Sequence, residues 1–434
     1  MNGGAVSEWR DIRLGEWVEA AKGSIKTGPF GSQLHAHEYT DDPLGIPVVM
    51  PKDMVHGRVA RKSVSRVAEE TAERLKTHRM APGDLVLARR GDVGRHAFIE
   101  DGEAGWLCGT GAMRVHAPDR TVIWPDFLRH AMANPEVTDW LVSRAVGATM
   151  PNLNGAIVAE VPLCVPGPRT QRQVAAALTA FNELIEINDR RIELLEDLAR
   201  SLYCEWFVRF RFPGHEDVAF VESELGAIPD GWSISTLADI ARVIIDGVAP
   251  SAVEAGSPYV GLEHLPRRST TLRAWGDIEL VTSRKLRFAP GDTLFGKIRP
   301  YFHKVAWAPF AGVASSDTIV VRAHGEQALP ALVNAVLSSD ALVAQAVATS
   351  NGTKMPRADP AALLGYPLVL PQPKSAIVGN FEQISGTYLQ HAATLSEHNR
   401  RLAATRDLLL PRLVTGQLDI SDVDLGDLLP PEAA

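Results

Sequence analysis

In two long stretches of the chain, mostly apolar residues recur at alternating spacings of four and three. This is the pattern of a helix that packs along a second helix, and we call the recurring residues the seam. Each pattern extends over about 35 residues, so each helix is expected to span about 50 Å at about 1.5 Å per residue. The apolar seam positions are Val174, Leu178, Phe181, Ile185, Ile192, Leu195 and Leu202 in the first helix, and Ile377, Phe381, Ile384, Tyr388, Leu395, Leu402 and Leu409 in the second.

The simplest partner for each predicted helix is the other, because the two seams are equally long and belong to one chain. The helices should run antiparallel, since each leaves its own domain and must return the chain to the other. The polar seam positions Asn188, His391 and His398 are expected to weaken this pair while fixing its register. The alternative is that each helix packs only on its own globular domain.

The remaining sequence consists of two halves in which similar segments recur in the same order, about 208 residues apart. A Gly-Asp turn followed by an apolar run and cations occupies residues 83–90, and again residues 291–298. Further along, the segment at residues 147–151 is echoed at residues 351–356. This period is too long for a solenoid or a propeller blade, so it predicts two similar domains that can each carry one binding surface.

Short strand-like runs accompany a helical segment in each half. They predict an α+β fold with a pseudo-two-fold internal repeat, in which two similar α/β domains are joined by two long antiparallel coiled-coil helices. The predicted parts are a first domain over residues 1–166, a central helix over 167–207, a crossover and second domain over 208–373, a C-terminal helix over 374–415 and an acidic tail over 416–434.

Charge is unevenly distributed along a chain whose formal net charge is −8. Residues 58–95 hold ten basic and five acidic residues, and residues 267–304 hold nine basic and three acidic residues. These two stretches occupy corresponding places in the two halves. An acidic chain can therefore still present two basic faces to phosphates. The alternative is that both stretches are ordinary solvated surfaces.

The sequence offers little support for a catalytic or metal-binding role. Residues 291–297 fit GxxxxGK, but Ile298 stands where a phosphate-binding loop needs Ser or Thr for magnesium. No NPPY- or DPPY-like tetrad of an adenine methyltransferase and no HExxH metal motif occurs. We therefore predict no catalytic residue and no metal ligand in this chain.

Cysteine usage and hydropathy bear on the cellular environment. Cys108, Cys164 and Cys204 form no CxxC pair, so neither a disulfide framework nor a zinc site is predicted. No stretch has the layout of a signal peptide or the length of a membrane span, so we expect a cytoplasmic protein without a membrane partner.

Several segments, spread over nearly the whole chain, carry a family resemblance. They are TGPFGSQL at residues 27–34, ATMPNLN at 148–154, LLEDLARSLYCEWFVRFRF at 194–212, IPDGW at 228–232, IRPYFHKVA at 298–306 and LLLPRLVTGQL at 408–418. In this order they resemble the specificity (S) subunits of type I restriction-modification systems. The resemblance implies two target recognition domains, each reading one half of a split DNA sequence, and two antiparallel helices that hold them apart and dock methyltransferase subunits.

The function implied by this resemblance is sequence-specific binding of double-stranded DNA at a bipartite target. The chain would be a non-catalytic subunit that directs adenine methylation or restriction by its partners. Those partners would be methyltransferase (M) subunits, two per chain, and restriction (R) subunits, with S-adenosylmethionine, ATP and Mg expected in the partners and no cofactor in this chain. The alternative is a coiled-coil scaffold with two protein-binding globular domains and no DNA readout.

The candidate DNA contacts combine cations, the glycine-rich turn near the N-terminus and the two echoed segments. Some are expected to contact phosphates and others base edges. The second half opens with IDGVAP at residues 245–250 instead of TGPFG, which is compatible with two unlike half-sites. The candidates are Lys26, Thr27, Gly28, Phe30, Ser32, Arg89, Arg90, Arg95, Thr149, Asn152, Lys297, Arg299, Tyr301, His303, Lys304, Thr353 and Lys354.

Overall fold

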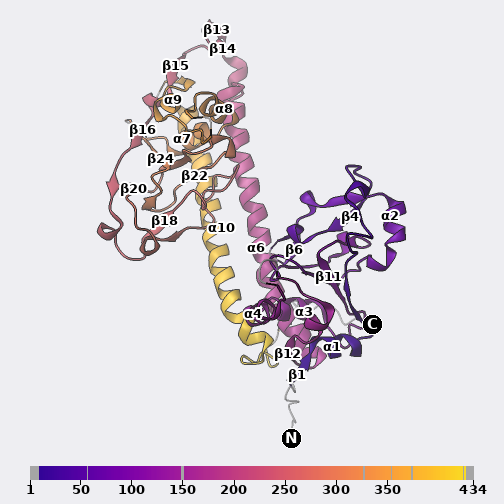
Figure 1. Cartoon of the computed structure of the whole chain (residues 1–434). Helices are drawn as coiled ribbons and strands as arrows, with labels where there is room; N and C mark the ends of the chain where they lie inside the picture. The colour runs from indigo at the N-terminus through magenta and orange to yellow at the C-terminus, as the bar shows by residue number, and fades with distance from the viewer. Residues whose placement is uncertain are drawn as a thin grey trace. The chain divides into compact units, whose positions relative to one another are not determined.

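The computed structural model describes residues 9–55, 57–147, 151–325, 328–352, 354–372, 375–423 and 425–426. The chain forms two compact units (Figure 1): unit 1 comprises residues 1–183 and 403–434, and unit 2 comprises residues 184–402. Each unit contains one mixed α/β domain and a part of both long helices. The division between the units therefore falls within the helices, whereas the sequence pattern places domain boundaries at the helix ends.

In its described residues, unit 1 contains two four-stranded sheets and two short strand pairs. The first sheet is antiparallel and has the order β2 (Ser24–Thr27), β11 (Ala112–His116), β8 (Leu85–Ala88) and β9 (His96–Phe98). The second has the order β10 (Leu107–Cys108), β4 (Ile46–Val49), β7 (Ser65–Val67) and β3 (Tyr39–Thr40), with β10 parallel to β4. The short pairs are β1 (Arg10–Arg13) with β12 (Pro162–Val165), and β5 (Met54–Val55) with β6 (Arg58–Val59).

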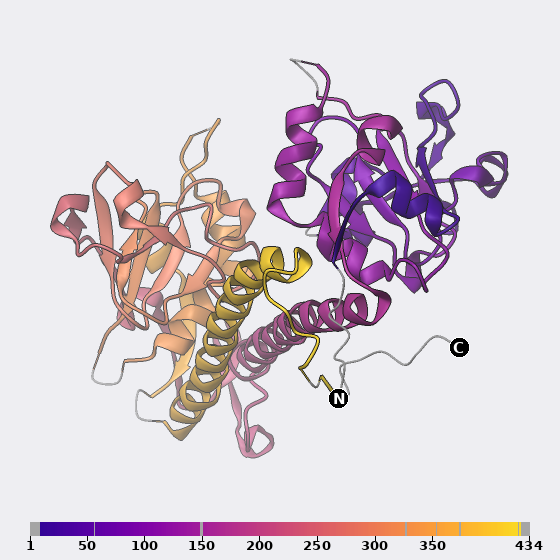
Figure 2. The same ribbon diagram turned by 90° about the horizontal axis from the view of Figure 1, so that it is seen from below.

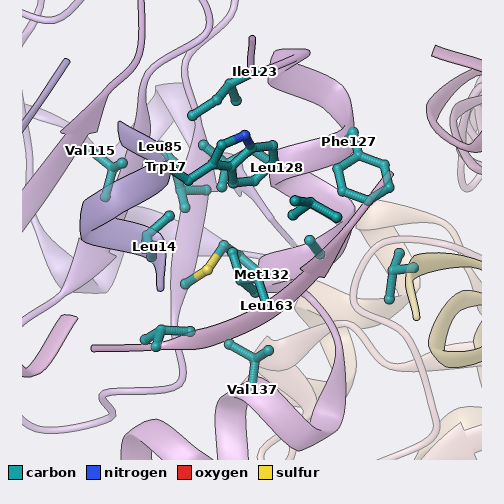
Figure 3. Packing of buried hydrophobic residues seen from close by; sticks show 14 of the residues in the cluster. Leu14, Trp17, Leu85, Val115, Ile123, Phe127, Leu128, Met132, Val137 and Leu163 are labelled. Atoms are coloured by element: carbon teal, nitrogen blue, oxygen red, sulfur yellow. The ribbon is translucent and has the colours of Figure 1, made fainter. Parts of the chain in front are cut away.

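The helices of this first domain are α1 (Leu14–Ala20), α2 (Glu69–Arg74), α3 (Pro125–Met132), α4 (Pro135–Arg144) and α5 (Gly155–Ala159). Figure 3 shows the apolar core around Trp17, where side chains from α1 and α3 meet those of β8. Alternate residues of β8 enter two different cores, so all four of its residues are buried. This explains why the strand reads in sequence as a continuous apolar run.

Unit 2 repeats this plan. Its antiparallel sheet has the order β16 (Ala241–Ile244), β24 (Thr318–Ala323), β21 (Thr293–Gly296) and β22 (Val305–Trp307). A five-stranded sheet has the order β17 (Gly247–Val248), β20 (Lys285–Phe288), β23 (Gly312–Ala314), β18 (Pro258–Val260) and β19 (Gly276–Asp277). Two further strand pairs are β13 (Phe220–Ser223) with β14 (Gly226–Pro229), and β15 (Trp232–Thr236) with β25 (Pro367–Pro371). The helices of this domain are α7 (Pro330–Leu337), α8 (Asp340–Ala348) and α9 (Pro360–Leu364).

The internal repeat predicted from the sequence is confirmed by strand topology. The order β2-β11-β8-β9 corresponds to β16-β24-β21-β22, and the parallel pair β4/β10 corresponds to β18/β23. The repeated Gly-Asp turn has a structural cause, because Asp84 and Asp292 are both buried and each accepts a hydrogen bond from the backbone N–H three residues earlier at 2.8 Å. Arg114 and Arg322 lie at corresponding positions beside these carboxylates.

The two long helices are α6 (Pro168–Tyr203, 36 residues), which continues into a π-helical turn at Cys204–Val208, and α10 (Ala376–Val414, 39 residues). In unit 1, Val174 near the start of α6 shares a core with Leu413 near the end of α10. In unit 2, Phe207 just beyond α6 packs edge-on against Phe381 near the start of α10, with ring centroids 5.0 Å apart. The helices therefore pair antiparallel within each unit, as the sequence predicts; Figure 2 shows α6 and α10 from below.

The structure differs from the predicted seam at two polar positions of α10. All the predicted apolar positions of both helices are buried or half-buried, but His391 and His398 are exposed. The buried polar positions of α10 are instead Ser385, Ser396 and Asn399. Asn188 donates from Nδ2 to Asn399 Oδ1 at 2.9 Å, so an asparagine pair occupies the polar position in the seam.

Small side chains on α10 explain why its buried polar positions differ from the predicted ones. Serine and alanine side chains of α10 allow the second domain to pack closely on the helix, and Ser396 Oγ donates to the Leu272 carbonyl at 2.7 Å. The same domain is anchored to α6 by Glu196, which is 7% exposed. Its Oε1 accepts hydrogen bonds from Ser269 Oγ and from the backbone N–H groups of Thr270 and Thr271 at 2.7 to 3.0 Å. Unit 2 is therefore a single packed body of domain and helices.

No single helix in the described part of the chain is long and apolar enough to cross a membrane. Helices α7 and α8 reach that length and composition only as a pair bent by 57°. Apolar side chains of both helices, including Leu332, Leu337 and Leu342, lie in the core of unit 2.

Candidate nucleic-acid interface

In unit 1, the loop that follows the central strand β8 is joined to the end of the first echoed segment and to the two residues after it. Leu153 N–H donates to the Arg89 carbonyl at 2.8 Å, and Gly91 N–H donates to the Pro151 carbonyl at 3.2 Å. Between these two bonds, Asn152 forms an isolated β-bridge with the backbone of residue 90. We call residues 89–91 together with 151–153 the first strand-end site.

In unit 2, the same backbone contacts recur after strand β21. Ala358 N–H donates to the Lys297 carbonyl at 2.9 Å, and Arg299 N–H donates to the Pro356 carbonyl at 2.7 Å. Arg357 forms the isolated β-bridge with the backbone of residue 298. Residues 297–299 together with 356–358 form the second strand-end site. Arg89 thus corresponds to Lys297, Gly91 to Arg299 and Asn152 to Arg357.

Arg89 is the central cation of the first strand-end site. Its guanidinium lies 5.1 Å from the centroid of the Phe30 ring, and its Nε donates to Asn152 Oδ1 at 3.3 Å. Burial lowers the pKa of Arg89, with a second contribution from the neighbouring Arg90, which is exposed. A partly desolvated guanidinium next to a second cation favours an anionic partner, because such a partner offsets both the lost hydration and the repulsion.

The glycine-rich turn brings Phe30 to this position. A Cβ on Gly28 would lie 2.1 Å from the Gly109 carbonyl oxygen, so only glycine allows the two backbones to approach this closely. Gln33 Oε1 accepts a hydrogen bond from Phe30 N–H at 3.0 Å, which closes the turn after the proline. The Phe30 side chain, 50% exposed, is thereby held next to Arg89 at the surface.

Other predicted residues of unit 1 lie near this turn or in ion pairs. Lys26 and Thr27 belong to β2, where Lys26 is exposed, and Ser32 is exposed in the turn. Arg95 forms a surface ion pair with Asp92 at 2.8 Å, so its charge is already partly neutralised. Thr149 lies outside the described residues.

The second strand-end site holds a cation in a strained backbone conformation. Arg299 has φ +52°, in the left-handed region, where Gly91 stands in the first site with φ +76°. For a residue with a Cβ this conformation costs about 1–2 kcal/mol. The Arg299 guanidinium lies 6.0 Å from the centroid of the Phe302 ring, and Arg267 covers the same ring at 4.1 Å. Basic and aromatic side chains therefore gather at this site.

Two predicted contacts of the second domain have partners inside the domain. His303 is 8% exposed, its Nε2 lies 2.8 Å from the Ser338 carbonyl oxygen, and burial lowers its pKa. Lys304 is half-buried and donates to the Leu262 carbonyl, and its pKa is lowered by burial first and by Arg267 second. Among the other predicted residues of that loop, Lys297 and Arg299 are half-buried and Tyr301 is 52% exposed.

Lys354 is exposed in the loop before the second strand-end site, and Thr353 lies outside the described residues. Two residues of this region, Arg267 and Arg357, were not among the predicted contacts. Arg267 belongs to the second basic stretch, and Arg357 is a cation at the position where the first half has Asn152. Both features are visible in the sequence, but only the backbone bridges reveal that Arg357 lies beside the strand-end cations.

The first basic stretch does not form a continuous basic face. Most of its cations are ion-paired within unit 1: Arg58 with Glu100, Arg61 with Glu103, Arg74 with Glu38, Lys76 with Glu73 and Arg79 with Glu69. In the described part of the chain, no ion pair involves Arg90, Lys297, Arg299 or Arg357. These four cations of the strand-end sites are therefore not neutralised by acidic side chains of the described residues.

Comparison with known proteins shows what this chain is similar to. The model of the type I restriction modification DNA specificity domain matches residues 7–197. The MjaIX type I restriction enzyme specificity subunit of Methanocaldococcus jannaschii is 23% identical over 399 residues, which cover 87% of this chain and 88% of the relative. The HindI specificity subunit of Haemophilus influenzae is 23% identical over 245 residues, covering 56% of this chain and 50% of the relative.

Among solved structures, the S subunit of a type I restriction-modification system from M. genitalium matches with a TM-score of 0.59 at 12% sequence identity. The match covers 95% of this chain and 98% of that chain. It confirms the fold expected from the sequence, with two domains joined by long helices.

Proposed function

Because this chain belongs to the family of type I restriction-modification specificity subunits, we propose that it reads a DNA target made of two separate segments, one with each domain. Members of this family are the non-catalytic, DNA-recognising subunits of complexes that also contain M and R subunits. The family relationship therefore assigns methylation and cleavage to the partner subunits. We further propose that S-adenosylmethionine, ATP and Mg bind those partners and that the complex acts in the cytoplasm.

The observation that carries the proposal is the duplication of the strand-end site. Both sites use the same two backbone hydrogen bonds to join a strand-end loop to an echoed segment, and both present cations there. Their side chains differ, with Arg89 and Asn152 in one and Lys297 and Arg357 in the other. Side chains that contact base edges supply specificity. Two sites with the same backbone geometry and different side chains are therefore suited to reading two different short sequences.

Mapping of methylated adenines tests this function directly. In cells that produce this chain with its M subunit, we expect methylation at a target of two short specified segments separated by unspecified bases. Cells that produce the M subunit without this chain should lack methylation at that target. A continuous target, or the same methylated sites in the absence of the chain, would contradict the proposal.

A second apolar stripe on α6 supports docking of an M subunit on the helices. Leu184, Ile187, Leu194 and Leu198 are each about half exposed, with Arg191 at the intervening position. Their spacing alternates between three and four, one residue before the seam that faces α10, so α6 presents a second coiled-coil face within unit 2. We propose that an amphipathic helix of the M subunit packs on this stripe. The two domains are the basis for proposing two M subunits per chain.

Replacing Leu194 and Leu198 together by glutamate is expected to remove the M subunit from the purified complex. Two carboxylates in the apolar stripe would have to be desolvated on docking, which costs several kcal/mol. The matched control carries Val142→Glu and Leu408→Glu, two exposed apolar positions outside the stripe. Co-purification of M should be unchanged in the control. Normal co-purification of the stripe variant, with unchanged helical content by circular dichroism, would show that M does not dock there.

A further inference from the structure

One position in each strand-end site has the same backbone setting but a different side chain. Asn152 and Arg357 both form isolated bridges with the loop after the central strand, and each lies between the two hydrogen bonds that join its loops. The backbone therefore presents residue 152 and residue 357 in corresponding ways. The chemical difference between the two sites at this position is an amide in one and a guanidinium in the other.

We propose that residues 152 and 357 determine the specificity of the two half-sites, with Asn152 reading an adenine in one and Arg357 reading a guanine in the other. This inference rests on the proposed function. In the major groove, an asparagine amide matches N6 and N7 of adenine, and an arginine guanidinium matches O6 and N7 of guanine. The side chain at this position thus specifies a different purine in each half-site.

The surroundings of Asn152 support its role. Arg89 Nε donates to Asn152 Oδ1 at 3.3 Å, and the Arg89 guanidinium is held against Phe30. An amide oxygen has two lone pairs, so Oδ1 can accept from adenine N6 while it still accepts from Arg89, and Nδ2 remains available to donate to N7. Arg89 is therefore a positioning residue that fixes the orientation of the amide.

The surroundings of Arg357 support a different contact. Its side chain is exposed, and the structure shows no ion pair for it within the described residues. The adjacent backbone is fixed, because Ala358 N–H donates to the Lys297 carbonyl at 2.9 Å and Arg299 N–H donates to the Pro356 carbonyl at 2.7 Å. A guanidinium on a fixed loop, without an acidic partner, is available for a two-point contact with guanine.

Exchange of the two residues tests the assignment through methylated sites. We expect Asn152→Arg, made in the full chain with its M subunit, to change one base pair in one half-site, and Arg357→Asn to change one base pair in the other. The spacer and the opposite half-site should stay unchanged. Ser143→Arg and Arg401→Asn make similar charge changes at exposed positions of α4 and α10 and should leave the target unchanged. Unchanged targets in both exchange variants would overturn the assignment.

Base analogues provide a measurement that does not depend on the exchange variants. Binding of the wild-type complex should weaken about 5- to 150-fold when the adenine read by Asn152 is replaced by 7-deazaadenine, which lacks N7. The same loss is expected for 7-deazaguanine at the base read by Arg357. Asn152→Ala should abolish sensitivity to 7-deazaadenine, and Arg89→Met should reduce it, while sensitivity to 7-deazaguanine in the other half-site persists.

Equal binding of normal and 7-deaza duplexes by the wild-type complex would also overturn the assignment. These outcomes are distinct from failure of the proposed function. If the wild-type target does not consist of two separated segments, the proposed function fails. If the target is bipartite but neither the exchanges nor the analogues have an effect at the assigned bases, only the assignment of residues 152 and 357 fails.

Discussion

A variant without four of the five strand-end cations is expected to bind its DNA target about 1,000-fold more weakly in the assembled complex. The changes are Arg89→Gln, Arg90→Gln, Lys297→Gln and Arg299→Gln. If each cation contributes about 1 kcal/mol, the combined loss is about 4 kcal/mol, or about three powers of ten. The variant should also depend less on salt, because each lost phosphate contact lowers the slope of log K against log salt by about 0.9.

The measurement is a titration of a target duplex with the complex at several salt concentrations. The matched control replaces four exposed cations outside the strand-end sites, which are Lys76, Arg144, Arg190 and Arg401. Both variants lose the same formal charge, so a general electrostatic effect would weaken them equally. We expect the control to retain most of the affinity and the wild-type salt slope. Equal losses in the two variants would exclude a specific contact at the strand-end sites.

Lengthening both long helices by one heptad is expected to change the number of unspecified bases in the target and to leave the two specified segments intact. Seven residues add about 10 Å to a helix, which corresponds to about three base pairs along DNA. The natural insertion points follow Glu183 in α6 and Leu402 in α10, where each helix passes from one unit to the other. A heptad preserves the phase of the seam on either side.

Methylated adenines mapped in cells that carry each version provide the readout. An insertion in α6 alone is the control, because it shifts one seam against the other and should prevent assembly of an active complex. If the double insertion changes the specified bases and preserves the spacing, the helices do not set the spacing.

The sequence predicts those parts of the fold that depend on strong local patterns. The turns at Asp84 and Asp292 recur because a buried carboxylate is needed to close each of them. The seam of α6 is readable because its buried positions are mostly large and apolar. The register of α10 is harder to predict from the sequence. Ser385 and Ser396 are buried because neighbouring segments approach closely, and buried serines do not stand out in a pattern of apolar residues.

The site could be predicted only in part for a related reason. Sequence charge indicates where cations occur but not which of them already have partners. His303 and Lys304 stand in a basic stretch, yet both contact carbonyl groups inside their domain. Arg357 is distant in sequence from Lys297, and only the backbone hydrogen bonds between their loops bring them together.

The left-handed backbone conformation of Arg299 lowers the stability of the fold, but it places a cation where DNA is proposed to bind. Gly91 shows that glycine satisfies the same backbone geometry in the other copy of this loop. A chain selected for thermal stability alone would therefore favour glycine at position 299, because the steric cost of the Cβ would disappear. Directed evolution towards heat resistance would then weaken DNA binding at one half of the target before the fold itself changed.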